Sequence, residues 1–204
     1  GTGAPALILS GGEASDEMIH PRFREQLLQI LRERSVLRGD FVLASGKRSN
    51  VYVDARLTTL HAKAMPLIGR TFLQKMIERG WVTDAVGGLT MGADPIVSAV
   101  ARESLEYGHS IDGFLIRKEA KGHGRGRFVE GLQSGEGKTA VIVEDTSTTG
   151  GSTVKAIERA REFGFDVKGA ISLVDREEGG REAIEAAGVG FDRVFTLAEL
   201  LAEG

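Results

Sequence analysis

The run VIVEDTSTTGGST at residues 141–153 constrains the fold of this chain more than any other segment. Its β-branched start predicts a buried strand that ends at Glu144 and Asp145, and a helical pattern opens at Val154 after a turn of hydroxyl residues and glycines. The free N–H groups of such a turn and of a helix start attract phosphate. The two carboxylates would repel phosphate but suit sugar hydroxyls or a hydrated cation. The segment therefore predicts a site for a ribose 5-phosphate.

The rest of the chain alternates between strand-like and helix-like segments, which predicts an α/β fold with a parallel sheet. Ligands of such sheets bind beyond the carboxyl ends of the strands, and Gly88, Arg117, Glu144 and Arg176 fall at such ends. The expected strands are 83–88, 111–116, 139–144, 167–174 and 193–196, the expected helices are 23–33, 61–79, 96–106, 154–163 and about 181–187, and a hairpin is expected over 41–53.

Composition limits the class of protein. The 204 residues are 41% hydrophobic and 27% charged, which is typical of one globular domain. A net charge of −3 gives no general attraction to nucleic acid, and no apolar run approaches the roughly 20 residues that cross a bilayer. The absence of cysteine fits a reducing cytoplasm. Residues 1–20, rich in glycine and serine, are interpreted as a flexible arm or a cloning remnant.

A second informative segment is RKEAKGHGRGRFVEG at residues 117–131. Its five basic residues surround His123, and glycines at 122, 124 and 126 disfavour a stable helix or strand there. A mobile basic loop suits a leaving group that gains negative charge, such as pyrophosphate. The alternative, a solvated loop or a nucleic-acid patch, is disfavoured because only Phe128 is available for base stacking.

These segments carry a family resemblance. Residues 141–153 resemble the phosphoribosyl-diphosphate (PRPP) motif of type I phosphoribosyltransferases. Residues 117–131 and FVLASGKRSNVYVDAR (41–56) are similar to the catalytic loop and the N-terminal substrate segment of orotate phosphoribosyltransferases, in the same order. The resemblance runs from about Phe23 to near the C-terminus. It implies a type I phosphoribosyltransferase-like parallel sheet flanked by helices over 21–204, with a small N-terminal hood formed mainly by 21–60 and a mobile catalytic loop at 117–131.

The resemblance implies transfer of ribose 5-phosphate from PRPP to orotate, giving orotidine 5′-monophosphate and pyrophosphate in UMP synthesis. Arg176 would pair with the orotate carboxylate through its guanidinium fork. The implied catalytic residues are Lys118, Lys121, His123 and Asp145. The implied PRPP contacts are Arg117, Lys118, Lys121, His123, Glu144, Asp145, Thr146, Ser147, Thr148, Thr149, Gly150, Gly151 and Ser152, and the implied orotate contacts are Thr148, Arg176, Tyr52, Val53 and Lys47.

The resemblance also implies Mg²⁺, held mostly through PRPP and water, with Asp145 as a candidate protein ligand. Asp94 is a carboxylate added to the family pattern and a candidate to help hold the ion through water. A cytoplasmic homodimer that shares the catalytic loop between subunits is expected. Two positions depart from the family pattern, since Ala44 and Gly92 stand where many relatives carry lysine, and Lys47 or Arg48 could supply the first missing charge. Two other functions stay open: a phosphoribosyltransferase for another (purine) base, and a PRPP-sensing regulator without catalysis.

Overall fold

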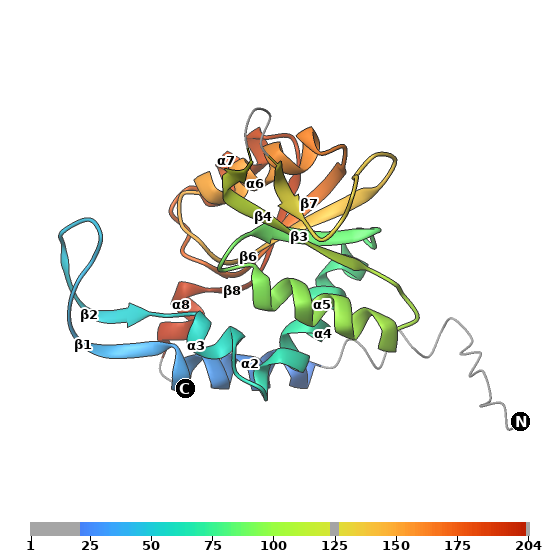
Figure 1. The fold of residues 1–204 in the computed structure, drawn as a ribbon. Coiled ribbons are helices and arrows are strands. Elements are labelled where there is room, and N and C mark those ends of the chain that lie inside the picture. Colours follow the sequence, from blue (N-terminus) through green and yellow to red (C-terminus); the bar gives the residue numbers. More distant parts are fainter. Residues whose placement is uncertain (1–20, 123–126, 203–204) are drawn as a thin grey trace, which may run out of the picture.

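The computed structural model describes residues 21–122 and 127–202, which form a six-stranded sheet with helices on both faces (Figure 1). The strand order is β5-β4-β3-β6-β7-β8, and every neighbouring pair is parallel except β4 and β5. The predicted α/β class is confirmed, while residues 1–20 and His123 lie outside the described residues. The strands are β3 (Ala85–Leu89), β4 (Asp112–Lys121), β5 (Arg127–Glu130), β6 (Thr139–Ser147), β7 (Asp166–Asp175) and β8 (Gly190–Thr196).

Two apolar clusters hold the sheet between its helical layers (Figure 1). Val141 and Val143 of β6 join the cluster of α2, α4 and α5, whereas Ala140 and Ile142 join that of α6 and α7. This alternation follows from the two-residue period of a strand and explains why β6 is apolar on both faces. The helices are α2 (Pro21–Arg34), α3 (Arg56–Thr59), α4 (Ala64–Glu78), α5 (Asp94–Glu106), α6 (Gly151–Glu162), α7 (Gly180–Ala186) and α8 (Leu197–Leu201).

The N-terminal region consists of α2 and a hairpin that projects from the body of the protein (Figure 1). The predicted hairpin is present as β1 (Val36–Val42) and β2 (Arg48–Val53), an antiparallel pair that turns at Gly46 with φ of 81°. Helix α2 buries Leu27 and Leu31 completely in the same cluster as α4 and α5. Helix α2 therefore belongs to the main core, and the hairpin is the part that stands apart from it. The division into a hood (21–60) and one domain over 21–204 stays a prediction.

Two strands run further than the sequence pattern predicted. Strand β6 continues beyond Glu144 to Ser147 because its last residues pair with β7, Thr146 opposite Val174 and Ser147 opposite Asp175. Strand β4 continues to Lys121, where it pairs with Arg127 of β5. The expectation that glycines exclude a strand at 117–131 was therefore wrong for 117–121 and 127–130. An antiparallel partner stabilises both segments, and a single-sequence pattern does not show that partner.

None of the helices in 21–122 and 127–202 combines the length and the apolar character that a membrane span requires.

Candidate functional site

The turn after β6 encloses a small cavity of about 80 Å³, lined by Glu144 and residues 146–152. Helix α6 begins at Gly151 immediately beyond this turn. Its N-cap, Gly150, has a φ of 85° and offers no side-chain cap, so the first N–H groups of the helix are left for another acceptor. A phosphate is the acceptor that such a helix start favours. The structure thus brings the predicted phosphate-binding segment together around one cavity.

The phosphate turn (residues 146–152) packs tightly against the loop that joins β7 to α7 and against Gly180, the first residue of α7. A Cβ added to Gly150 would lie 2.9 Å from the carbonyl oxygen of Gly180, and one added to Gly180 would lie 2.5 Å from Ser147 Oγ. Both contacts are closer than a side chain tolerates, so glycine is required at each position. Ser147 is almost fully buried by this contact, and its hydroxyl has no hydrogen-bond partner among the described residues.

The two predicted acids leave β6 on opposite faces, as neighbouring strand residues do. Glu144 accepts a hydrogen bond from the Thr153 hydroxyl and lines the phosphate cavity. Asp145 instead lies against the loop after β3, since a Cβ added to Gly92 would come within 2.5 Å of Asp145 Oδ1. Its Oδ1 also accepts the N–H of Thr146 at 2.8 Å. The acids therefore flank the end of β6.

Burial raises the pKa of both acids. The pKa of Glu144 rises to about 7 because burial outweighs the hydrogen bond from Thr153, and the negative charge of Asp145 adds to the rise. Burial also raises the pKa of Asp145, opposed by the Thr146 N–H and by the positive charge of Arg56. Sugar hydroxyls or a cation would supply the interactions that favour the charged forms of both groups.

The raised pKa of Glu144 predicts a pH dependence of stability. The pKa of Glu144 is higher in the fold than its ordinary value of 4.5. The contribution of its protonated carboxyl group to the free energy of unfolding is therefore complete below about pH 4.5 and is lost as pH rises through about 7. On account of Glu144, the free energy of unfolding of the wild-type protein should fall by on the order of 1 to 3 kcal/mol between pH 5 and pH 8, and Glu144→Gln should not show this fall. Urea denaturation of both proteins at the two pH values measures it. Equal pH dependence in the two proteins would contradict the assignment.

A second cavity, of about 270 Å³, lies beside the end of β3 and is lined in part by the basic segment, residues 117–131. Arg117 and Lys118 line it together with Thr90 and Glu130. Arg117 Nη1 lies 3.7 Å from Glu130 Oε1, and Lys121 is exposed at the end of β4. Two of the predicted PRPP contacts therefore share one cavity, and Lys121 lies three residues further along the same strand. His123 belongs to the segment outside the described residues.

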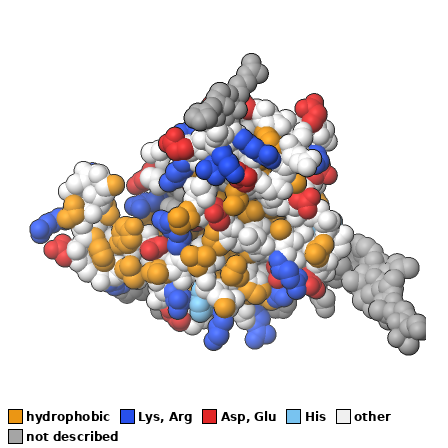
Figure 2. All heavy atoms as spheres, in the orientation of Figure 1, with side chains coloured by type: hydrophobic (Ala, Val, Ile, Leu, Met, Phe, Trp, Pro, Cys, Tyr) orange, Lys and Arg blue, Asp and Glu red, His pale blue; other side chains and the backbone are white. Residues whose placement is uncertain are grey.

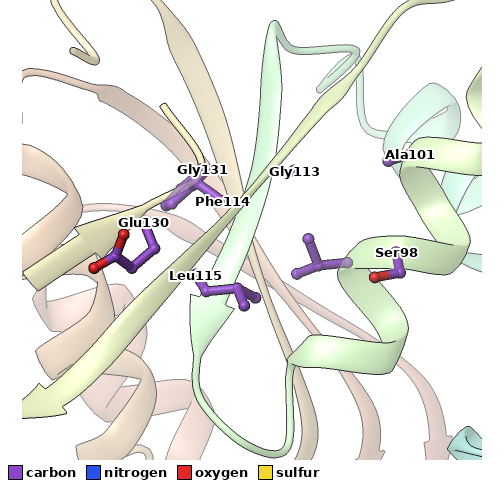
Figure 3. Close-up of a pocket in the computed structure, with 8 residues that line it drawn as sticks. Ser98, Ala101, Gly113, Phe114, Leu115, Glu130 and Gly131 are labelled. Carbon is purple, nitrogen blue, oxygen red and sulfur yellow. The ribbon is translucent and has the colours of Figure 1, made fainter. Parts of the chain in front are cut away.

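An apolar cavity, also about 270 Å³, adjoins the basic one and was not predicted from the sequence (Figure 3). Ser98 and Ala101 reach it from α5, while Leu115 and Glu130 lie on its opposite side (Figure 3). Leu115 and Glu130 line both cavities. Apart from Glu130, its lining side chains are small or apolar and offer no positive charge, which makes this cavity unsuited to a phosphate.

Arg176 follows β7 and lies beside the phosphate turn. The backbone N–H of Arg176 donates to the carbonyl oxygen of Ser147 at 2.9 Å, which joins the loop after β7 to the phosphate turn. Its Nε is buried and has no hydrogen-bond partner among the described residues, and Glu178 Oε2 is 3.9 Å away. A guanidinium group with an unused buried donor is suited to bind a carboxylate ligand. Thr148, the other predicted contact near the base, lines the phosphate cavity.

The predicted base contacts of the hairpin are spread over its two faces. Tyr52 is half-exposed with its ring 5.7 Å from that of Phe41, whereas Val53 packs against the main apolar cluster. Lys47 lies exposed in the hairpin turn, as does Ala44. The roles of Tyr52, Val53 and Lys47 in binding orotate stay predictions.

Three residues near the acids make contacts that the sequence did not predict. Thr153 anchors Glu144 from the first turn of α6, and its place directly after the glycines was the only signal for it. A Cβ added to Gly92 would lie 2.5 Å from Asp145 Oδ1, so a larger residue at this position would require the Asp145 side chain to shift. Arg56 donates from Nη1 to the Met91 sulfur at 3.5 Å and lowers the pKa of Asp145. Arg56 therefore places a positive charge near Asp145.

The residues present fit a hydrated Mg²⁺. Asp94 accepts a hydrogen bond from Thr90 through Oδ2 at 2.9 Å, while its buried Oδ1 has no donor among the described residues. Asp94 and Asp145 offer carboxylate oxygens near the loop that contains Gly92, and oxygen ligands are the kind that Mg²⁺ prefers. The described residues contain no group of three or more histidine, cysteine, aspartate or glutamate side chains close enough to hold a metal.

A phosphate turn at a helix start, a flanking acid pair and a basic strand end, all on a parallel sheet, define the class of protein. Residues 57–197 match the family described as the phosphoribosyl transferase domain. Within that class, the chain belongs to the orotate phosphoribosyltransferase family. It is 42% identical over 177 residues to the enzyme of that name from Synechocystis, covering 87% of this chain and 88% of the relative.

Solved structures agree with this family. The orotate phosphoribosyltransferase of Mycobacterium tuberculosis H37Rv in complex with Fe(III) dicitrate has a TM-score of 0.80 at 40% identity, covering 88% of this chain and 99% of that chain. A structure of the same enzyme in complex with PRPP has a TM-score of 0.75 at 38% identity, covering 87% and 98%.

Proposed function

We propose that this chain transfers the ribose 5-phosphate of PRPP to orotate, producing orotidine 5′-monophosphate and pyrophosphate for UMP synthesis. The observation that carries the proposal is the junction of two loops. The Arg176 backbone N–H is bonded to the Ser147 carbonyl oxygen, so the residue proposed to bind a carboxylate starts directly beside the turn proposed to bind phosphate. A substrate pair with one phosphate-bearing sugar and one carboxylate-bearing base matches this junction. The relatives named above are enzymes for that pair.

In the proposed reaction, the turn at 146–152 holds the 5′-phosphate through backbone N–H groups and hydroxyls. Glu144 and Asp145 accept hydrogen bonds from the ribose hydroxyls. The bond between C1′ and the pyrophosphate oxygen breaks, and its electron pair leaves with pyrophosphate. Orotate gives up its N1 proton to water, and N1 then supplies the pair that forms the new bond to C1′, which carries positive charge in the transition state. Arg117, Lys118 and Lys121 stabilise the charge that develops on the leaving group.

We further propose that Mg²⁺ is required. When bound, it would neutralise pyrophosphate oxygens, and it would be held mainly by PRPP and water. On the protein, Asp145 and the buried Oδ1 of Asp94 would orient its water ligands. The raised pKa of Asp145 supports this role, since a nearby cation favours the charged carboxylate.

The deciding experiment follows the absorbance of orotate after PRPP and Mg²⁺ are added to the purified protein. We expect orotate absorbance to fall with enzyme-dependent kinetics, and EDTA to stop the reaction. Turnover of a purine base without orotate consumption would replace the substrate assignment. Binding of PRPP without turnover of any base would favour the sensor function instead.

We infer a homodimer that shares the basic segment between subunits, and a cytoplasmic location. Hydrophobic side chains are visible on the surface of the single chain (Figure 2). The exposed large ones include Leu60, Met91 and Leu105, and burial against a second copy would remove such side chains from water. The absence of cysteine supports a reducing compartment. The molar mass in solution, measured by light scattering, tests the dimer, and a mass of 21.8 kDa would exclude it.

A further inference from the structure

Arg193 of β8 joins both sequence neighbours of Arg176. Its Nη1 lies 2.8 Å from Asp175 Oδ2 and 2.8 Å from Glu177 Oε1. Asp175 is almost fully buried, and its second oxygen accepts the N–H of Glu177 at 2.9 Å. One guanidinium group therefore holds the chain on either side of Arg176 against the edge of the sheet.

The backbone at this point needs such support. Glu177 has a φ of 58°, the left-handed region that residues with a side chain rarely adopt, at a cost of about 1 to 2 kcal/mol. The hydrogen bond from Glu177 to Asp175 and the ion pair from Glu177 to Arg193 both act on this turn. Because Arg176 precedes Glu177 directly, a change in the turn would move the Arg176 side chain.

Arg193 also controls which acids compete for Arg176. Three acids surround Arg176 in the sequence: Asp175, Glu177 and Glu178. Two of them pair with Arg193, and the third stays 3.9 Å from Arg176 Nε. Without Arg193, Asp175 and Glu177 would lack their cation and would compete with a ligand carboxylate for the Arg176 guanidinium.

We propose that Arg193 is a positioning residue for orotate: by pairing with Asp175 and Glu177 it fixes the Arg176 turn and keeps the Arg176 guanidinium available for the ligand carboxylate. The proposal rests on the proposed function. It assigns to Arg193 a larger effect on orotate than on PRPP, because Arg193 pairs directly with the chain after β7, whereas the phosphate turn of β6 and α6 meets that chain only through the packing of Gly180 and the Arg176 backbone N–H.

The test compares Arg193→Met with the wild-type protein. The KM for orotate should rise about tenfold, equivalent to about 1.4 kcal/mol, while the KM for PRPP stays within about twofold. Arg193→Lys should restore part of the orotate affinity, since it keeps the charge but not the planar fork. The matched control is Lys75→Met, which removes the ion pair from Lys75 to Asp192, the neighbouring residue on β8, at 3.4 Å. Both KM values should stay unchanged in the control.

Selectivity between the substrates decides the outcome. An unchanged KM for orotate in Arg193→Met, or equal rises for both substrates, would overturn the proposal as a merely structural effect. If Arg193→Met does not fold, Glu177→Gln tests the support of the turn alone, because it removes one of the two pairs, at an exposed side chain, together with one competing acid, and it should still raise the KM for orotate more than the KM for PRPP. Wild-type protein that does not consume orotate would instead refute the proposed function, and the positioning role with it.

Discussion

Replacing Lys121 with alanine should lower kcat by about 100- to 1,000-fold while changing the affinity for PRPP only a few-fold. Lys121 is exposed at the end of β4, in the basic segment whose Arg117 and Lys118 line the cavity beside β3. A cation that contacts the leaving group stabilises mainly the charge that forms as the bond breaks. Its removal therefore affects the transition state more than the bound substrate.

Steady-state kinetics and PRPP titration together measure this effect. Lys138→Ala is the matched control. Lys138 is also an exposed lysine, but it precedes the first residue of β6, whereas Lys121 lies at the last residue of β4. The control should keep wild-type kcat. A Lys121→Ala protein with normal kcat but weakened PRPP binding would show that Lys121 serves binding alone.

Replacing Arg176 with alanine should lower kcat/KM for orotate by about 30-fold or more, since loss of one partner of a buried charge pair costs about 2 to 5 kcal/mol. The Arg176 Nε is buried with no hydrogen-bond partner in the described part of the chain, so a ligand carboxylate gains a donor that is not already in use. PRPP binding should be nearly unchanged, because the phosphate turn remains intact. Arg176→Lys should fall between the two, as it keeps the charge without the fork.

Competition kinetics with orotate and a purine base measure the specificity directly. Arg102→Ala provides the control, since Arg102 pairs with Glu106 on the exposed side of α5 at 2.7 Å. This variant should leave kcat/KM unchanged for orotate and for the purine base. Orotate turnover that survives in Arg176→Ala would exclude Arg176 as the carboxylate contact and favour another base.

The two variants together test whether the basic segment acts on the partner subunit's site. In a mixed dimer of Lys121→Ala and Arg176→Ala chains, a shared segment places both changes in one site and leaves the other site complete. Random mixing of refolded chains should then restore about a quarter of wild-type activity. If each chain completes its own site, every site carries one change and no activity returns.

Much of the site could be predicted because its central part is contiguous. The strand, the turn and the helix start at 139–163 depend on residues within a few positions of one another, and Glu144 and residues 146–152 of that stretch line one cavity. The ends of the strands were less predictable. Strand β6 reaches Ser147 and β4 reaches Lys121 because neighbouring strands supply hydrogen bonds there, and no local pattern records the partner.

The residues that support the site came only from the tertiary structure. Gly92 is 53 positions from Asp145, and Arg193 lies 17 positions from Arg176, with a helix between. Their side chains carry no pattern that links them to the site, since exposed arginines and single glycines are common in any chain. The close approach of Asp145 to Gly92 is visible only in the tertiary structure.

The sequence by itself determined the α/β class, the phosphate turn and the identity of its acids, because apolar periodicity and turn chemistry are local properties. Only the tertiary structure decided that the two acids face opposite sides of β6, that Arg56 supplies charge beside Asp145, and that Arg193 holds the turn of Arg176. Those meetings depend on how the whole sheet and its helices pack, and packing is set by contacts summed over the chain rather than by any short segment.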